Sequence, residues 1–407
     1  MDWINRIPQL FCRSVLRVFR GRRAVPGTPR SRSLEHRRLN AEHLEPRQLL
    51  SVAWQPLSEI PAVDASPGTA AAPAFESPGR PHRVGNREID RGGNVVHLDP
   101  VPDSWLTELP GDSFLAEAAA SPASGPFPLA DTFFLHSYPS ATKTIYLDFD
   151  GHVTSGTSWN TSYSGGSTIV TPAFSLDSDS KFSDLELERI QAIWQRVAED
   201  YRPFEVNVTT QDPGAEALRK LGTGDAAWGI RMVIGGSSTD WFSTQAFGGV
   251  AYVGSFNWSN DTPAFVFENN LTNGSEKLVA EAITHEAGHT LGLEHDGTTA
   301  GVEYYTGHGS GATGWAPIMG SGYSRELTQW SKGEYPNANN SEDDLSIITT
   351  GNGFGYRPDD HGGISTAATA LNPTGGSILA GEGIIERNTD RDYFSFATGA
   401  GLVALTV

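Results

Sequence analysis

The sequence predicts an α/β (α+β) domain over residues 140–355, in which a mixed β-sheet is backed by two helices. Three observations lead to this prediction. Apolar and polar residues alternate in several short runs, as in strands, and they recur at steps of three and four in longer runs, as in helices. The 407 residues are also enough to bury a large core.

The first strand is expected in TKTIYLDFDGH (142–152), where apolar residues alternate before a turn at Asp150-Gly151. The first helix is expected in SDLELERIQAIWQRVAEDYRPF (183–204), which has the helical period and ends before Pro203. Ser183 and Glu186 have the spacing of a capping box and so mark its start.

Four further strands are expected in FEVNVTT (204–210), GIRMVIGG (229–236), GGVAYVGSF (248–256) and PAFVFEN (263–269). A second helix follows, with Ser275 as its predicted N-cap and a buried stripe that includes Leu278 and Ile283. The stretch to about residue 340 predicts a smaller, loop-rich C-terminal subdomain. A short helix in SEDDLSII follows it, capped by Ser341 with Asp344.

Three regions flank this domain. Residues 1–52 form a basic leader, and residues 53–139, rich in Pro, Ala, Ser and Gly, predict a disordered linker or pro-segment. Residues 356–407 predict a partial β-rich module that stops inside an apolar run, which suggests either a truncated fragment or a partner surface that completes the module. Its NTDRDYFSF segment is similar to the start of the bacterial pre-peptidase C-terminal domain.

The charge distribution argues against nucleic acid as a partner. Residues 1–50 carry eleven Arg, no Lys and four acids, a net of +7, so the formal −19 of the chain leaves −26 on the rest. An acidic body offers no basic face to displace counterions from phosphates. No run of eighteen apolar residues is present, so no transmembrane segment is expected.

The basic leader, residues 1–52, contains a segment that indicates export. HLEPRQLLSV (43–52) resembles the LEPR-x-LL segment near the N-termini of large exported proteins of certain bacteria, which implies a secreted, extracellular or cell-surface location. Cys12 is the only cysteine, so no intrachain disulfide can form. Disulfide-free extracellular enzymes of bacteria often rely on calcium, so structural Ca²⁺ is expected at sites that the sequence does not specify.

The segment HEAGHTLGLEHDG (285–297) has the spacing of a metal site. His285 and His289 lie one turn apart on a helix and can share one ion. Ten further residues of helix would carry His295 roughly 15 Å from His285. Gly292 can adopt a positive φ, end the helix and turn the chain so that His295 becomes the third ligand.

Three neutral imidazoles suit Zn²⁺ and leave a fourth position for water. Zinc lowers the pKa of its water to about 7, and Glu286 is placed to act as general acid/base. The pattern therefore predicts a zinc endopeptidase that hydrolyses a protein or peptide substrate by attack of the zinc-bound water.

The pattern HExxHxxGxxH, followed by Asp296, resembles the reprolysin-like branch of the metzincin zinc metallopeptidases. The resemblance implies a metzincin-like fold with a zinc cleft, and a methionine turn beneath the metal, for which Met319 in WAPIMGSGY is the candidate. Tyr323 stands four residues after Met319, where some metzincins place a tyrosine two residues after, so its participation is left open, as is that of His308.

Two other functions are compatible with the motif. One is a cell-surface adhesion or binding module that retains a non-catalytic zinc site, and the other is a zinc hydrolase acting on a non-peptide bond. The acidic spacing of DSDSKFSDLE (177–186) suggests a calcium loop, but helix capping accounts for it better. Substrate preference and oligomeric state cannot be predicted from these residues.

Overall fold

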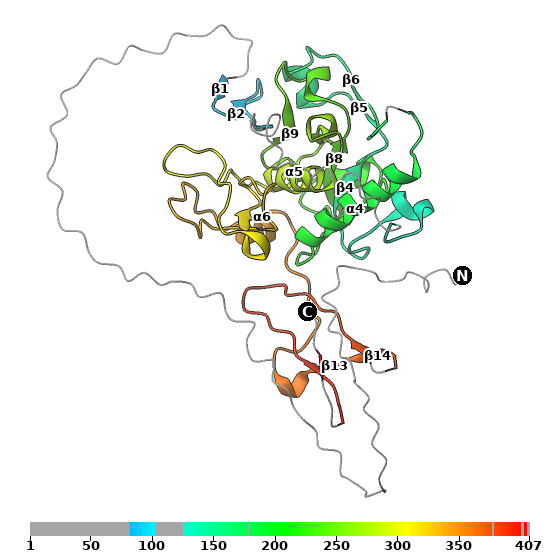
Figure 1. Cartoon of the computed structure of the whole chain (residues 1–407). Coiled ribbons are helices and arrows are strands. Elements are labelled where there is room, and N and C mark those ends of the chain that lie inside the picture. Colours follow the sequence, from blue (N-terminus) through cyan, green and yellow to red (C-terminus); the bar gives the residue numbers. More distant parts are fainter. Residues whose placement is uncertain (1–81, 102–124, 178, 377, 400–402, 405–407) are drawn as a thin grey trace, which may run out of the picture. The chain divides into compact units, whose positions relative to one another are not determined.

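The computed structural model describes residues 82–101, 125–177, 179–376, 378–399 and 403–404 (Figure 1). Its first compact unit contains residues 82–101, 125–359 and 384–389. The basic leader, Cys12 and the segment HLEPRQLLSV lie outside the described residues. Among the described residues, no helix has the length and apolar character needed to cross a membrane.

An eight-stranded mixed sheet forms the centre of this unit, in the order β1-β2-β3-β9-β10-β8-β4-β7. From β1 to β10 each neighbouring pair is antiparallel, whereas β10, β8, β4 and β7 are parallel. The prediction of a mixed α/β fold with a large sheet is therefore confirmed. The strands are β1 (His82–Val84), β2 (Arg87–Ile89), β3 (Val95–Pro100), β4 (Lys143–Asp148), β7 (Asn207–Thr209), β8 (Trp228–Ile234), β9 (Phe247–Tyr252) and β10 (Ala264–Val266).

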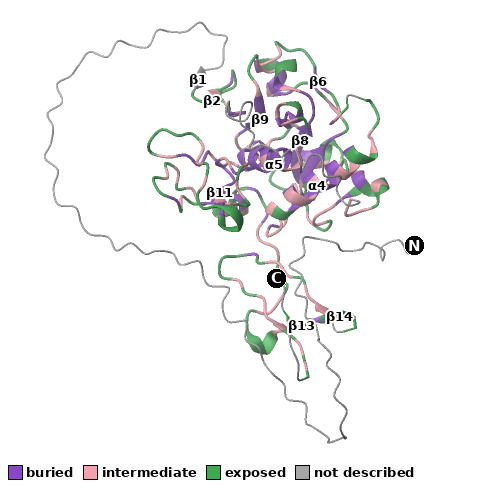
Figure 2. Cartoon of the chain, viewed as in Figure 1, coloured by how far each residue is buried: buried purple, intermediate pink, exposed green. Residues whose placement is uncertain are grey.

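Two helices back the sheet, α4 (Asp184–Asp200) and α5 (Glu276–Thr290), and they pack against each other. The hydroxyl of Tyr201 donates to the carbonyl of Thr284 (3.1 Å), and the hydroxyl of Thr284 donates to Asp200 Oδ2 (2.8 Å). Both faces of the sheet are buried at its central strands β8, β9 and β10 (Figure 2). Side chains of β8, β9 and β10 alternate between a core shared with α4 and α5 and a second core that contains Trp159 and Phe247.

The capping predictions have different outcomes. The capping box of Ser183 and Glu186 is present at α4, with the Ser183 amide donating to Glu186 Oε2 (2.7 Å). Ser275 occupies the N-cap of α5 without a side-chain hydrogen bond. At α6 (Asp344–Gly351) the prediction was wrong, because Asp343, not Ser341, caps the helix, and Asp344 accepts instead from the Ser331 amide (2.8 Å).

Shorter elements complete the described residues. The α-helix and strands are α3 (Ser158–Ser162), β5 (His152–Thr154), β6 (Ile169–Thr171), β11 (Trp315–Pro317), β12 (Leu327–Gln329), β13 (Thr369–Ala370), β14 (Asn372–Gly375), β15 (Ile378–Ala380) and β16 (Phe394–Ser395). The 3-10 helices are η1 (Leu129–Phe134), η2 (Ala215–Leu218), η3 (Ser238–Asp240), η4 (Ser255–Asn257), η5 (Glu268–Asn270), η6 (Gly311–Thr313) and η7 (Ser365–Ala367). Beyond residue 359, β13 pairs with β16 and β14 with β15.

The expectation of disorder throughout residues 53–139 is wrong for the part that the structure describes. Strands β1 to β3 extend the sheet, and Val96 and Leu98 of β3 are buried in the second core. Between 125 and 139, Phe127 packs edge-on against Trp194, and Leu135 is buried in the core shared with α4 and α5. The average composition of residues 53–139 does not indicate these short ordered segments. Each segment is stabilised by contacts with residues distant in sequence, which composition does not reflect.

Candidate metal centre

Helix α5 and the turn after it bring the predicted histidines together. His285 and His289 lie one turn apart on α5, which ends at Thr290. Gly292 has a φ of 105°, a value that L side chains rarely adopt, so the predicted left-handed turn is present. The Gly292 amide donates to the carbonyl of His289 (2.9 Å), and the chain reverses to place His295 beside the helix.

The imidazole Nε2 atoms of His285, His289 and His295 converge with a carboxylate oxygen of Asp99, all within 4.8 Å of one another. His289 Nε2 and His295 Nε2 are 3.0 Å apart. Asp99 Oδ1 lies 2.9 Å from His295 Nε2 and 3.4 Å from His285 Nε2, and Asp99 Oδ2 lies 3.6 Å from His289 Nε2. All four residues are buried.

The other ring nitrogen of each histidine is held by an acceptor at 2.8–2.9 Å. The acceptors are the Ile318 carbonyl for His285, the Leu293 carbonyl for His289 and the Glu303 carboxylate for His295. An Nδ1–H that donates in this way leaves the Nε2 lone pair of a neutral ring free for a metal. His285 Nε2 is buried without a hydrogen-bond partner, so the donor set fits a cation such as Zn²⁺.

Glu286 lies beside this centre, under strand β9. A Cβ added to Gly249 would stand 2.5 Å from Glu286 Cγ and Cδ, so the carboxyl side chain lies directly against the glycine backbone. Burial, together with the nearby carboxylate of Asp99, raises the pKa of Glu286 well above its ordinary value. The structure thus brings Glu286 close to the position that Asp99 occupies.

Met319 is fully buried beneath α5. A Cβ added to Gly288, between the two helix histidines, would stand 2.5 Å from the Met319 sulfur. The preceding residue, Ile318, accepts the hydrogen bond from His285, and the Met319 carbonyl accepts from the Asp296 amide (2.8 Å). This placement is compatible with a methionine turn, a role that stays a prediction.

The sequence did not lead to a predicted role for Asp99 or its neighbours. The hydroxyl of Tyr304 donates to Asp99 Oδ1 (2.7 Å), and its ring lies 4.5 Å from that of His295. His97, also on β3, stacks on His289 at 4.3 Å, and its Nε2 lies 2.7 Å from Glu294 Oε2. The alternation in VVHLDP (95–100) was the available signal, and it lies in a region whose composition indicates a linker.

The charges at the centre are strongly coupled. Burial alone would raise the pKa of Asp99, but His295 and His285 together hold it well below its ordinary value. Burial opposes protonation of His295, yet Asp99 and Glu303 raise its pKa to about 9. Burial lowers the pKa of His289 well below the ordinary 6.5. Asp99 is therefore an anion that interacts with the whole histidine group.

Of the residues whose role was left open, Tyr323 is the nearer to the centre. Burial and the carboxyls of Asp99 and Glu286 raise the pKa of Tyr323 well above its ordinary value. His308 is exposed in a loop, where the Tyr305 hydroxyl lies 2.9 Å from its Nδ1. The expectation of structural calcium gains no support from the described part of the chain, and Glu186 accepts capping bonds instead.

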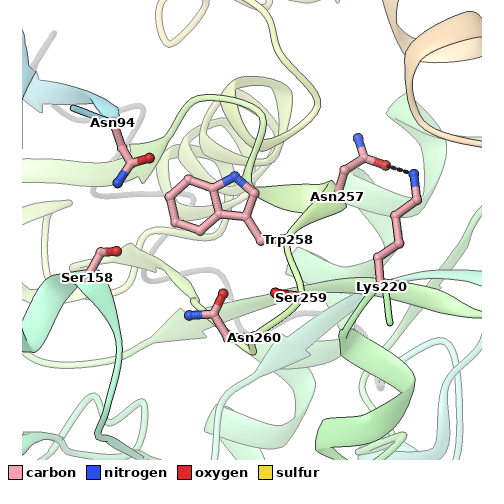
Figure 3. Close-up of a pocket in the computed structure, with 7 residues that line it drawn as sticks. All are labelled: Asn94, Ser158, Lys220, Asn257, Trp258, Ser259 and Asn260. Atoms are coloured by element: carbon pink, nitrogen blue, oxygen red, sulfur yellow. Dashed lines mark hydrogen bonds between the residues drawn. The ribbon is translucent and has the colours of Figure 1, made fainter. Parts of the chain in front are cut away.

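A separate polar pocket of about 420 Å³ is lined by none of these residues (Figure 3). Its lining is Asn94, Ser158, Lys220, Asn257, Trp258, Ser259 and Asn260. Lys220 donates to Asn257 (3.1 Å), so its ammonium group is already held. The pocket offers no carboxylate or imidazole, and the histidine centre remains the candidate site for chemistry.

The chain combines a mixed sheet with a buried group of three histidines, two of which lie on helix α5. In these features it resembles the metzincin-like zinc metallopeptidases. The family model described as metallo-peptidase family M12 (Reprolysin_5) matches residues 233–331 and supports this class. The matched region contains β9, β10, α5, the three histidines and Met319. No curated protein and no solved structure matches the chain.

Proposed function

We propose that the chain is an exported zinc endopeptidase. The observation that carries the proposal is the convergence of three buried Nε2 atoms beside the buried carboxyl of Glu286. A site that only stabilised the fold would not require a general base at this position. The match to a metallopeptidase family supports a protein or peptide as substrate.

His285, His289 and His295 would hold the metal, with their rings fixed by the hydrogen bonds at Nδ1. When bound, zinc would act as a Lewis acid that lowers the pKa of water and polarises the scissile carbonyl. Glu286 would accept the proton of the attacking water and return it to the leaving amine. Its buried position raises its proton affinity, which suits both steps.

Export rests on the resemblance of HLEPRQLLSV to segments of exported bacterial proteins. The proposal is that the folded unit acts outside the cell or at its surface. Fractionation of the native host, followed by detection of the chain in the medium, the cell surface or the cytoplasm, tests this part. Recovery in the cytoplasm alone would refute it.

One observation favours the second candidate, a binding module with a non-catalytic zinc site. Asp99 supplies a fourth ligand atom, and four protein ligands are typical of a structural zinc site. In that function Asp99 would stay in place permanently, and the metal would stabilise the fold.

Cleavage of a casein-type substrate distinguishes the two candidates. The full chain is loaded with zinc and assayed beside its Glu286→Ala variant. The proposal expects cleavage that a chelator abolishes, that zinc restores and that the Glu286→Ala variant lacks. Absence of cleavage by the folded full chain with zinc bound would favour the binding module.

A further inference from the structure

The polar pocket of Figure 3 combines one aromatic ring with hydrogen-bonding side chains from four segments of the chain. Asn94 comes from the turn between β2 and β3, and Ser158 is the first residue of α3. Lys220 follows η2, and residues 257–260 come after strand β9. Figure 3 shows the indole of Trp258 between Asn94 on one side and Lys220 on the other. The pocket thus has an aromatic surface surrounded by polar groups.

Among the described residues that line the pocket, the one charged side chain is already engaged. The Lys220 ammonium donates to Asn257 Oδ1 (3.1 Å) and lies 4.4 Å from the centre of the Trp228 ring. Asn257 is engaged in turn, since its amide donates to Asn352 Oδ1 (2.8 Å). The lining therefore lacks the group of basic side chains with which proteins bind phosphate.

The remaining polar side chains have hydrogen-bonding capacity left for a ligand. The amide nitrogen of Asn94 donates to both carboxylate oxygens of Asp90 (3.0 and 3.2 Å), which leaves Asn94 Oδ1 as an acceptor. Within the described part of the chain, the side chains of Ser158, Ser259 and Asn260 make no hydrogen bond. Hydroxyls and amides both donate and accept, so these groups match a ligand that is itself rich in hydroxyls.

The indole of Trp258 is held in place by its backbone and by a neighbouring ring. Its amide donates to the Ser255 carbonyl (3.0 Å), and its carbonyl accepts from the Lys220 amide (2.9 Å). Its ring lies 5.1 Å from that of Tyr252, a buried residue of β9, while Trp258 itself is half-buried. Such an indole offers a rigid, flat apolar surface with an N–H donor at its edge. The C–H face of a pyranose ring is complementary to this surface.

The same lining argues against other classes of ligand. An apolar ligand requires predominantly apolar walls, whereas Trp258 is the one apolar side chain among the described lining residues. An extended peptide requires an open strand edge, but β9, which leads toward residues 257–260, is paired with β3 on one edge and with β10 on the other. A neutral sugar, by contrast, uses both the ring and the polar groups.

We propose that this pocket is a carbohydrate-binding subsite that takes a neutral pyranose unit of an oligosaccharide. The C–H face of the sugar packs on the Trp258 indole, and the sugar hydroxyls bind Ser158, Asn260 and Asn94 Oδ1. The volume of about 420 Å³ lies within the range of small-molecule sites. The subsite is separate from the histidine centre, so it adds recognition of a glycan to the proposed hydrolysis of peptide bonds.

The test measures the binding of neutral trisaccharides (maltotriose, cellotriose, mannotriose and chitotriose) to the zinc-loaded full chain by isothermal titration calorimetry. Trp258→Ala removes the stacking surface, and Asn260→Ala removes an exposed amide from the lining. Asn269→Ala is the matched control, because Asn269 is an exposed asparagine beyond the other end of β10 and does not line the pocket. Thermal unfolding checks that each variant is folded.

At least one trisaccharide should bind with a Kd of about 1 mM or lower. Trp258→Ala should weaken this binding about tenfold or more, and Asn260→Ala should weaken it about two- to tenfold, the effect of one lost hydrogen bond. Asn269→Ala should bind as the unsubstituted chain does. The proposal is overturned if no trisaccharide binds the folded full chain, or if both pocket variants bind with undiminished affinity.

Inorganic phosphate is the second probe, because it separates an anion site from a sugar site. Phosphate should not compete with the trisaccharide, and the affinity for the sugar should be insensitive to salt, since the ligand is uncharged. Phosphate binding that Lys220→Ala abolishes would assign the pocket to anions and overturn the carbohydrate subsite. Because binding does not require turnover, failure of the peptidase proposal would leave these outcomes unchanged.

Discussion

Replacement of Gly249 by alanine tests the placement of Glu286 while the Glu286 side chain and the histidines keep their chemical identity. Gly249 lies in β9 with Glu286 packed against its backbone. A methyl group at this position would stand 2.5 Å from Glu286 Cγ and Cδ and closer still to Oε1. Glu286 is only 1% exposed, so the crowding cannot be relieved by a swing into solvent.

The geometry gives the size of the effect. Carbon atoms in contact prefer about 3.5–4.0 Å, so the Glu286 side chain must move by about 1 Å or more. Overpacking of this kind typically costs about 1–3 kcal/mol of stability. A misplacement of about 1 Å in a catalytic group can reduce turnover about a hundredfold, and this is the loss expected for Gly249→Ala.

The assay compares zinc content, melting temperature and casein cleavage in full-length variants. Gly248→Ala is the matched control, since the atoms nearest to its methyl group would be Leu271 Cδ2 (3.2 Å), the Asp99 carbonyl oxygen (3.6 Å) and Leu271 Cγ (3.9 Å), and none of these belongs to Glu286. We expect stoichiometric zinc in both variants and a large loss of cleavage only in Gly249→Ala. Undiminished cleavage by folded Gly249→Ala would refute the placement of Glu286 as the base.

The remaining predictions concern the ligands and the pH dependence of stability. Glu286→Ala should keep zinc, measured by metal analysis, and lose cleavage by about a hundred to ten thousandfold; comparable turnover would remove Glu286 from the mechanism. His295→Ala should weaken zinc binding in a chelator competition, whereas His308→Ala, at an exposed loop residue, should not; unchanged affinity in the first variant would imply another third ligand. Burial raises the pKa of Asp344 from 3.8 to about 8, so the folded state holds a proton that the unfolded state releases, and stability falls as pH rises through this window. Asp344→Asn keeps an acceptor for the Ser331 amide and does not titrate, so it should raise the melting temperature by several degrees near pH 8 and by little near pH 4. This size follows from about 1.4 kcal/mol per pKa unit and about 2–4 °C per kcal/mol. Equal gains in melting temperature at both pH values would contradict this reasoning.

The helices, most strands and the turn at the centre could be predicted because their signals are local. The helical period locates α4 and α5, the spacing of His285 and His289 requires one turn, and Gly292 permits the reversal that positions His295. Each of these features depends on residues within a few positions of one another, and steric limits on the backbone restrict the alternatives.

Asp99 could not be predicted in the same way, because its partners are distant in sequence. The carboxylate reaches the histidines only when β3 pairs with β9 in one register, and a shift by one residue would turn Asp99 to the opposite face. The cap of α6 shows the same limit at short range. Ser341 and Asp343 are both good caps, and the interaction of Asp344 with Ser331 selects between them.

The alternation of β3 also explains how one strand can serve both faces of the sheet. Val96 and Leu98 are almost completely buried, and burial of such a side chain contributes about 1.5–3 kcal/mol as an upper figure. The main-chain pairing with β9 and the contacts of Asp99 add to this anchor. Because neighbouring side chains of a strand point to opposite faces, the burial of Val96 and Leu98 on one face helps to fix Asp99 beside the histidines on the other.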